Sequence, residues 1–138
     1  MLACLACSVI ISCTGNLPDK DWPVYGGNPE NTRYVALSGV DSSNVHLLKP
    51  VWEYRTGDAD SVHHSQIQCN PLIIDGVLYG TSPGMKMFAL DASIGVPIWT
   101  FNPFDSLPAE KQMFFVLNNS RGLSYWTDGA EDRRVFFT

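Results

Sequence analysis

The sequence of 138 residues predicts an all-β fold, and three observations support this. Apolar segments of four to six residues recur along the chain. Turn-forming residues, 11 Gly and 9 Pro, separate these segments. No stretch keeps a helical period of apolar residues over three turns. With 45% hydrophobic and 17% charged residues, the composition is typical of a folded domain, so short strands joined by tight turns are expected.

The charge of the chain argues against nucleic acid as a partner. The formal net charge is −5, and the nine basic residues are scattered along the sequence. Nucleic-acid binding depends on clustered Lys and Arg that neutralise phosphates. No nucleic-acid partner is therefore expected.

The first 13 residues are apolar and predict an export signal, because they are too few to span a bilayer. Ile10-Ile11-Ser12-Cys13 resembles the lipobox of bacterial lipoproteins, which implies lipidation of Cys13 and a membrane-anchored protein in the periplasm. Residues 14–20 would form a polar tether. No Lys or Arg precedes the apolar run, so an ordinary signal without lipidation remains the alternative. Cys4 and Cys7 have metal-site spacing but no second ligand pair nearby.

Four strands are expected between residues 71 and 101. Residues 71–74 and 77–81 flank Asp75-Gly76, a dipeptide typical of two-residue hairpin turns. A third strand is predicted at residues 85–90 and a fourth at 96–101, where Pro97 indicates an edge strand. Both faces of this sheet would be apolar, so it requires neighbours on each side.

A repeat places this sheet in a larger architecture. Residues 50–54 match residues 97–101 in residue type, 47 positions apart, a spacing within the range of β-propeller blades. We therefore predict the N-terminal part of an incomplete β-propeller at residues 21–138. Its parts would be an outer strand of the closing blade near residues 51–56, a first blade at 68–101 and the start of a second blade at 121–138.

The segment from Ala89 to Trp99 fits the A-x-D-x-x-x-G-x-x-x-W repeat of the pyrroloquinoline quinone (PQQ) dehydrogenase propellers. In this repeat the Asp starts a turn, the Gly supplies a positive φ, and the Trp packs on the next blade. Residues 21–27, 68–79 and 121–126 resemble segments of membrane-associated glucose and alcohol dehydrogenases in the same order. The resemblance implies an eight-bladed periplasmic enzyme that oxidises a sugar or other alcohol with PQQ and Ca²⁺. Electrons would pass to a quinone or a cytochrome.

The resemblance also implies two cofactor contacts. Arg121 lies where the family uses an arginine, and a guanidinium suits the carboxylates of PQQ. Gln68 lies where many members have a glutamate. The adjacent cysteines that alcohol-oxidising members often carry before this arginine are missing, which favours the sugar-oxidising or an uncharacterised branch. The family's catalytic Asp and calcium ligands lie in later blades, so this chain is expected to hold neither catalytic nor metal-binding residues.

Other polar residues have simpler interpretations. Asp58, Asp60 and the pair His63-His64 are expected to be solvated loop residues, and Cys69 a buried apolar one. Trp22, Trp52 and Trp99 are expected to be packing anchors. The alternative function is a propeller lipoprotein without a cofactor, similar to outer-membrane assembly scaffolds. Such a scaffold would not need the segment at residues 121–126.

Overall fold

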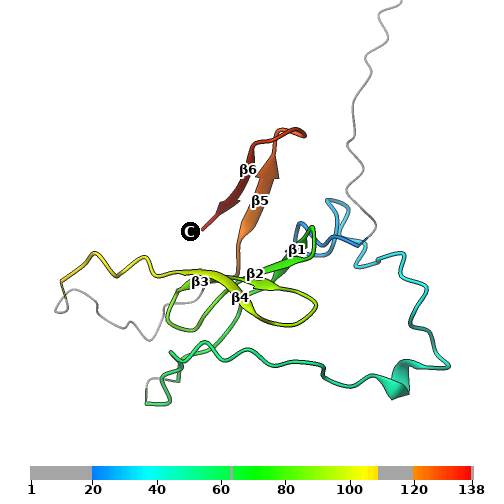
Figure 1. Ribbon diagram of the computed structural model, residues 1–138, viewed down its shortest axis with the longest axis horizontal. Coiled ribbons are helices and arrows are strands. Elements are labelled where there is room, and N and C mark those ends of the chain that lie inside the picture. The colour runs from blue at the N-terminus through cyan, green and yellow to red at the C-terminus, as the bar shows by residue number, and fades with distance from the viewer. Residues whose placement is uncertain (1–19, 63, 109–119, 138) are drawn as a thin grey trace, which may run out of the picture.

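The computed structural model of the chain describes residues 20–62, 64–108 and 120–137. The predicted signal segment, its Cys13 and nearly all of the tether lie outside these residues. A short 3-10 helix, η1, precedes six strands (Figure 1). The elements are η1 (Val45–Leu47), β1 (Leu72–Ile74), β2 (Val77–Thr81), β3 (Met87–Asp91), β4 (Pro97–Phe101), β5 (Ser124–Thr127) and β6 (Arg133–Phe136).

The strands form two antiparallel sheets. One has four strands in the order β1-β2-β3-β4, and the other consists of β5 and β6. The all-β prediction is confirmed, and within the described residues the strands do not close a ring. The edge position of β4 agrees with Pro97, whose missing N–H cannot serve a second neighbouring strand.

Local backbone geometry explains where the strands begin. Asp75 and Gly76 have φ of 50° and 77°, as a two-residue hairpin of the expected type requires. Met85 has φ of 67°, so it belongs to the turn and β3 begins at Met87 rather than at the predicted residue 85. The second-blade strand also begins later than predicted, at Ser124, because Gly122 pairs with Asn70 instead of β6.

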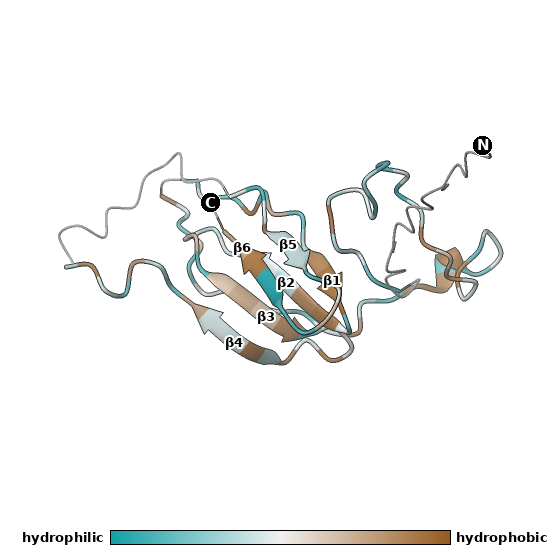
Figure 2. Ribbon diagram, turned by 90° about the horizontal axis from the view of Figure 1, so that it is seen from above, coloured by the Kyte–Doolittle hydropathy of each residue, from teal (hydrophilic) through white to brown (hydrophobic). Residues whose placement is uncertain are grey.

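The core lies between the two sheets. Leu72, Ile74 and Met87 project from the four-stranded sheet onto Leu123, and all four are at most 9% exposed. Partly buried residues complete this contact: Tyr79, Tyr125, Val135 and Phe137. Figure 2 shows hydrophobic residues along β1 and β3 of the four-stranded sheet, whereas β5 is pale. Burying each large apolar side chain contributes about 1.5–3 kcal/mol, so this contact stabilises the packing of the two sheets.

The opposite face of the sheet is covered by residues 51–56. Even-numbered side chains are partly buried there, and odd-numbered ones are exposed. The Tyr54 ring packs against Phe88 of β3, with ring centroids 5.1 Å apart. The segment is extended, as predicted, but within the described chain it joins no sheet because no strand lies beside its backbone. Its assignment to a closing blade stays a prediction.

Trp52 docks on the turn between β3 and β4. Its indole N–H donates a hydrogen bond of 3.2 Å to the carbonyl oxygen of Ala92. Gly95 has φ of 71°, and a Cβ atom there would lie 2.5 Å from Cδ2 of Trp52. The expected packing role of Trp52 is confirmed. Trp99, by contrast, is 39% exposed beside Tyr79, with ring centroids 6.1 Å apart.

The position of Tyr79 gives a prediction about alkaline pH. Burial, and to a lesser degree the charges of Tyr125 and Asp75, raise the pKa of Tyr79. Its contribution to stability is therefore complete below the unfolded pKa of about 10 and is lost as the pH rises through the folded pKa. We expect Tyr79→Phe to reduce the alkaline loss of stability, measured by hydrogen exchange of β2 amides between pH 9 and 11 after correction for intrinsic exchange. An unchanged pH profile would contradict this.

Candidate cofactor-binding site

Backbone pairing joins the two segments in which cofactor contacts are predicted. The Asn70 N–H donates a 3.0 Å hydrogen bond to the carbonyl oxygen of Arg121. Its side-chain amide makes a longer, 3.4 Å contact with the same oxygen. Asn70 and Gly122 form a parallel bridge, outside either sheet. The predicted first and second blades therefore meet one residue from Arg121 and two from Gln68.

Gly122 makes this close approach possible. Its φ is 122°, and a Cβ atom there would lie 2.7 Å from the carbonyl oxygen of Asn70. Real Cβ atoms do not come so close to a backbone oxygen, so only glycine fits. The Gly122 N–H is bound by Ser120 Oγ at 3.2 Å, and Ser120 is only 7% exposed. The backbone that carries Arg121 is thus held from two sides.

The Arg121 side chain is exposed and lies beside a cavity. Within the described residues its guanidinium makes no hydrogen bond or ion pair. The cavity has a volume of about 400 Å³. It is lined by Pro23, Val24, Tyr25 and residues 121–125. The aromatic N-terminal segment forms its second wall, because Trp22 is paired to Ile73 of β1 by two backbone hydrogen bonds of 2.7 and 3.0 Å.

Gln68 occupies a different position. Its side chain is partly exposed, and its amide donates a 3.2 Å hydrogen bond to Gln66 Oε1. Gln68 does not line the cavity beside Arg121. The structure therefore brings the two segments together through Asn70, whereas no direct contact joins the two predicted side chains within the described residues.

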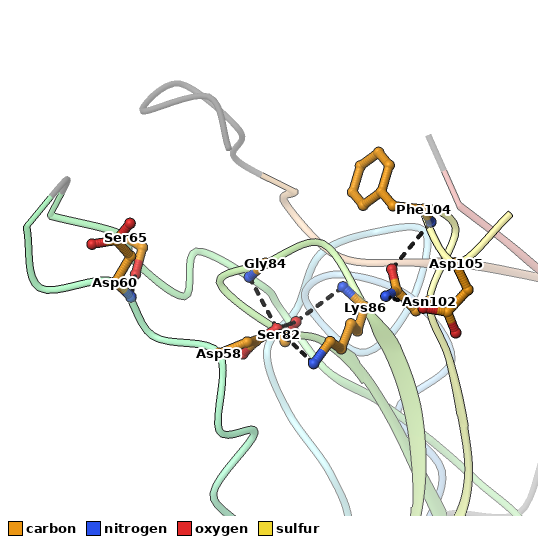
Figure 3. A network of polar contacts seen from close by, with 9 residues as sticks. All are labelled: Asp58, Asp60, Ser65, Ser82, Gly84, Lys86, Asn102, Phe104 and Asp105. Carbon is orange, nitrogen blue, oxygen red and sulfur yellow. Dashed lines mark hydrogen bonds and ion pairs between the residues drawn. The ribbon is translucent and has the colours of Figure 1, made fainter. Parts of the chain in front are cut away.

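Asp58 differs from the sequence-based expectation of a solvated carboxylate. Its side chain is only 12% exposed. Oδ2 accepts hydrogen bonds from Ser82 Oγ at 2.5 Å and from the Gly84 N–H at 3.2 Å, and Lys86 Nζ lies 3.9 Å away (Figure 3). The expectation is wrong because the β2–β3 turn folds over this part of the loop.

Neighbouring loop residues are bound more locally. Asp60 Oδ1 accepts a 2.8 Å hydrogen bond from the Val62 N–H, so Asp60 organises its own turn. Cys69 was expected to be buried, but it is partly exposed. Its Sγ accepts a 3.3 Å hydrogen bond from the Thr81 N–H, because Cys69 precedes β1 instead of lying within it. His64 is exposed, and His63 lies outside the described residues.

The described residues contain no group of three or more His, Cys, Asp or Glu arranged to bind a metal ion. No helix in the described part of the chain has the length and apolar character needed to cross a membrane.

Comparison with known proteins identifies the family. The family model described as "Glucose/ethanol/alcohol dehydrogenase, beta-propeller domain", the PQQ family, matches residues 22–138. The chain belongs to the PQQ-dependent dehydrogenase family. The predicted family resemblance is thereby confirmed, and the four-stranded sheet fits a blade of the family's propeller.

Individual relatives are named as glucose or alcohol dehydrogenases. The chain is 34% identical over 116 residues to the quinoprotein glucose dehydrogenase of Escherichia coli, a match that covers 82% of this chain and 14% of that protein. The 1-butanol dehydrogenase (cytochrome c) of Thauera butanivorans is 31% identical, covering 80% of this chain and 14% of its own length. An alcohol dehydrogenase (quinone) subunit of Gluconobacter oxydans is 35% identical, in a match that covers 77% of this chain and 13% of that protein. The chain thus spans about one seventh of these members of the PQQ-dependent family.

Proposed function

We propose that this chain is the N-terminal part of a longer quinoprotein dehydrogenase that oxidises a sugar or other alcohol. The observation that carries the proposal is the position of Arg121: its side chain lines a cavity and, among the described residues, has no hydrogen-bond or ion-pair partner, while its backbone is paired with Asn70. Cofactor and ligand sites commonly have volumes of about 300–1,000 Å³ with a few convergent polar groups.

The residues present fit PQQ as the cofactor. A guanidinium binds carboxylates through two parallel hydrogen bonds, and PQQ carries three carboxylates. Arg121 would hold one of them. Gln68, on the adjoining segment, would add a neutral hydrogen bond without repelling the cofactor's negative charge. When bound, PQQ supplies a quinone that accepts the electrons of alcohol oxidation. The role of this chain is to bind and orient the cofactor.

The remaining features of the proposed enzyme belong to parts outside this site. Ca²⁺ would be bound by residues of later blades, as in the family. Electrons would pass to a quinone or a cytochrome, the two acceptors that appear in the names of the relatives. Export to the periplasm and attachment through a lipid on Cys13 complete the proposal.

A propeller lipoprotein without a cofactor is the alternative function. The gene beyond Thr138 distinguishes the two. A reading frame that continues with further A-x-D-x-x-x-G-x-x-x-W repeats and an acidic metal site is expected for the enzyme. A stop codon at position 139 would contradict it for this chain. For the continued protein, reduction of a dye by sugars after addition of PQQ and Ca²⁺ tests the activity.

Arg121→Ala is expected to weaken PQQ binding by about 10- to 100-fold, since hydrogen bonds to charged groups contribute about 1.5–3 kcal/mol. The measurement is the dissociation constant of PQQ for the apoprotein that continues past Thr138. Arg121→Lys keeps the charge but loses the bidentate geometry, so it should restore binding only in part. Unchanged affinity in Arg121→Ala would remove the proposed role.

Lipidation is tested separately. Cells that express the protein are grown with a fatty-acid analogue, and label is expected on the wild type but not on Cys13→Ala. Absence of label on the wild type would favour an ordinary signal.

A further inference from the structure

The loop at residues 58–69 is attached at both ends to the dipeptide Thr81-Ser82. At its first end, Asp58 accepts the Ser82 hydroxyl hydrogen bond. At its last end, Cys69 Sγ accepts a hydrogen bond from the N–H of Thr81. Thr81 and Ser82 are adjacent at the end of β2 and are 1% and 4% exposed. The ends of the loop are therefore fixed at neighbouring positions on a buried part of the sheet.

The loop also has internal hydrogen bonds. The Asp60 N–H donates to Ser65 Oγ at 2.6 Å, and the Ser65 N–H donates to the Asp60 carbonyl oxygen at 2.9 Å. Figure 3 shows this pair away from the Asp58 cluster, toward the far end of the loop. Compact loops with closely spaced ends are Ω-loops, which are often functional. This loop carries Gln68 next to its last attachment point.

The two attachments differ in strength. A thiol is a weak hydrogen-bond acceptor, so the attachment of Cys69 to Thr81 is weak, and the stronger bond at this end is the one that the neighbouring Asn70 N–H donates to Arg121. At the Asp58 end, the carboxylate accepts hydrogen bonds from two donors and lies near the Lys86 ammonium. Such charge-assisted hydrogen bonds are about twice as strong as neutral ones. Ser82 also accepts from the Lys86 N–H at 2.9 Å, so Asp58 is attached to a turn that is itself ordered.

We propose that Asp58 is a positioning residue for the cofactor site, acting through the 58–69 loop to fix Gln68 next to the Arg121 segment. This inference rests on the proposed function, because it assumes that Gln68 contacts the cofactor. Asp58 itself would touch neither cofactor nor substrate.

A double-mutant cycle tests the inference in the apoprotein that continues past Thr138, with PQQ as the probe. Asp58→Asn keeps the volume but removes the charge that strengthens the attachment, and it is expected to weaken PQQ binding by about tenfold. In the Gln68→Ala background, Asp58→Asn should have no further effect, because residues that act through one another are not additive. Ser82→Ala removes the hydroxyl that donates to Asp58 and should weaken PQQ binding in the same direction.

Hydrogen exchange provides a readout that does not depend on the cofactor. Asp58→Asn should accelerate exchange of the amides of residues 60–66 and leave β3 unchanged. The matched control is Asp41→Asn, because Asp41 is a turn carboxylate that binds the Ser43 N–H and hydroxyl far along the sequence from this loop. It should change neither PQQ affinity nor exchange in the 58–69 loop.

The outcomes separate this inference from the proposed function. If Gln68→Ala weakens PQQ binding but Asp58→Asn does not, or if the two effects are additive, the positioning role is wrong and the cofactor site stands. If neither substitution matters while Arg121→Ala does, the inference fails and only the Arg121 contact remains. If Arg121→Ala also has no effect, the proposed function itself is wrong.

Discussion

Gly95→Ala is expected to destabilise the β1–β4 sheet by about 2–5 kcal/mol, because it combines two costs. An L-residue in the left-handed region costs about 1–2 kcal/mol, and overpacking of a filled site about 1–3 kcal/mol. The second cost arises because the new Cβ would meet the Trp52 ring. The measurement is the opening free energy of β3 amides by hydrogen exchange.

Gly76→Ala is the matched control for this substitution. Gly76 has nearly the same φ, 77°, but no atom lies within 4 Å of the position of its Cβ. Gly76→Ala should therefore cost only about 1–2 kcal/mol, the cost of placing an L-residue in the left-handed region. Equal losses in the two variants would show that Trp52 docking contributes nothing. In a Trp52→Ala background, the difference between the two glycine positions should disappear.

Gly122→Ala is expected to have the largest effect on the candidate site. The new Cβ would strike the Asn70 carbonyl oxygen, and backbone cannot move aside as a side chain can. We expect a local loss of about 2–5 kcal/mol from strain and overpacking, measured as faster exchange of the Asn70 amide. Displacement of Arg121 should also weaken PQQ binding at least as much as Arg121→Ala does.

Gly129→Ala serves as the control, in the β5–β6 hairpin that follows Gly122. Gly129 has φ of 82° with open space around it, in the turn between β5 and β6. It should cost about 1–2 kcal/mol and leave PQQ affinity unchanged. If Gly122→Ala behaved like Gly129→Ala in both measurements, the close approach of the two segments would not be needed for cofactor binding.

The parts of the fold that depend on neighbouring residues could be predicted from the sequence. The Asp75-Gly76 hairpin is specified by backbone preferences within four residues, and Pro97 restricts β4 to an edge. The packing role of Trp52 followed from its spacing in the repeat, but its docking position on the Ala92–Gly95 turn did not. These features are local or periodic, so one sequence is enough to find them.

The features that were missed depend on contacts between distant residues. Nothing near Asn70 in the sequence indicates that it pairs with Arg121, 51 positions later. Asp58 follows a Gly in a polar stretch, where most carboxylates are solvated, and only the fold of the 82–86 turn buries it. The Arg-Gly dipeptide at 121–122 was a usable signal, because a glycine beside a predicted ligand often marks a close backbone approach.

The contact between Trp52 and the turn at Gly95 also affects the order in which the protein can assemble. Its two partners are 40 residues apart, and both lie within the first 95 residues of the chain. Because chains are synthesised from the N-terminus, one apolar face of the β1–β4 sheet can be covered while later parts of the polypeptide are still being translated. Short loop closure makes this contact fast relative to pairing across a whole ring. Residues 51–56 can thus shield the nascent sheet from aggregation until the other face acquires its neighbour.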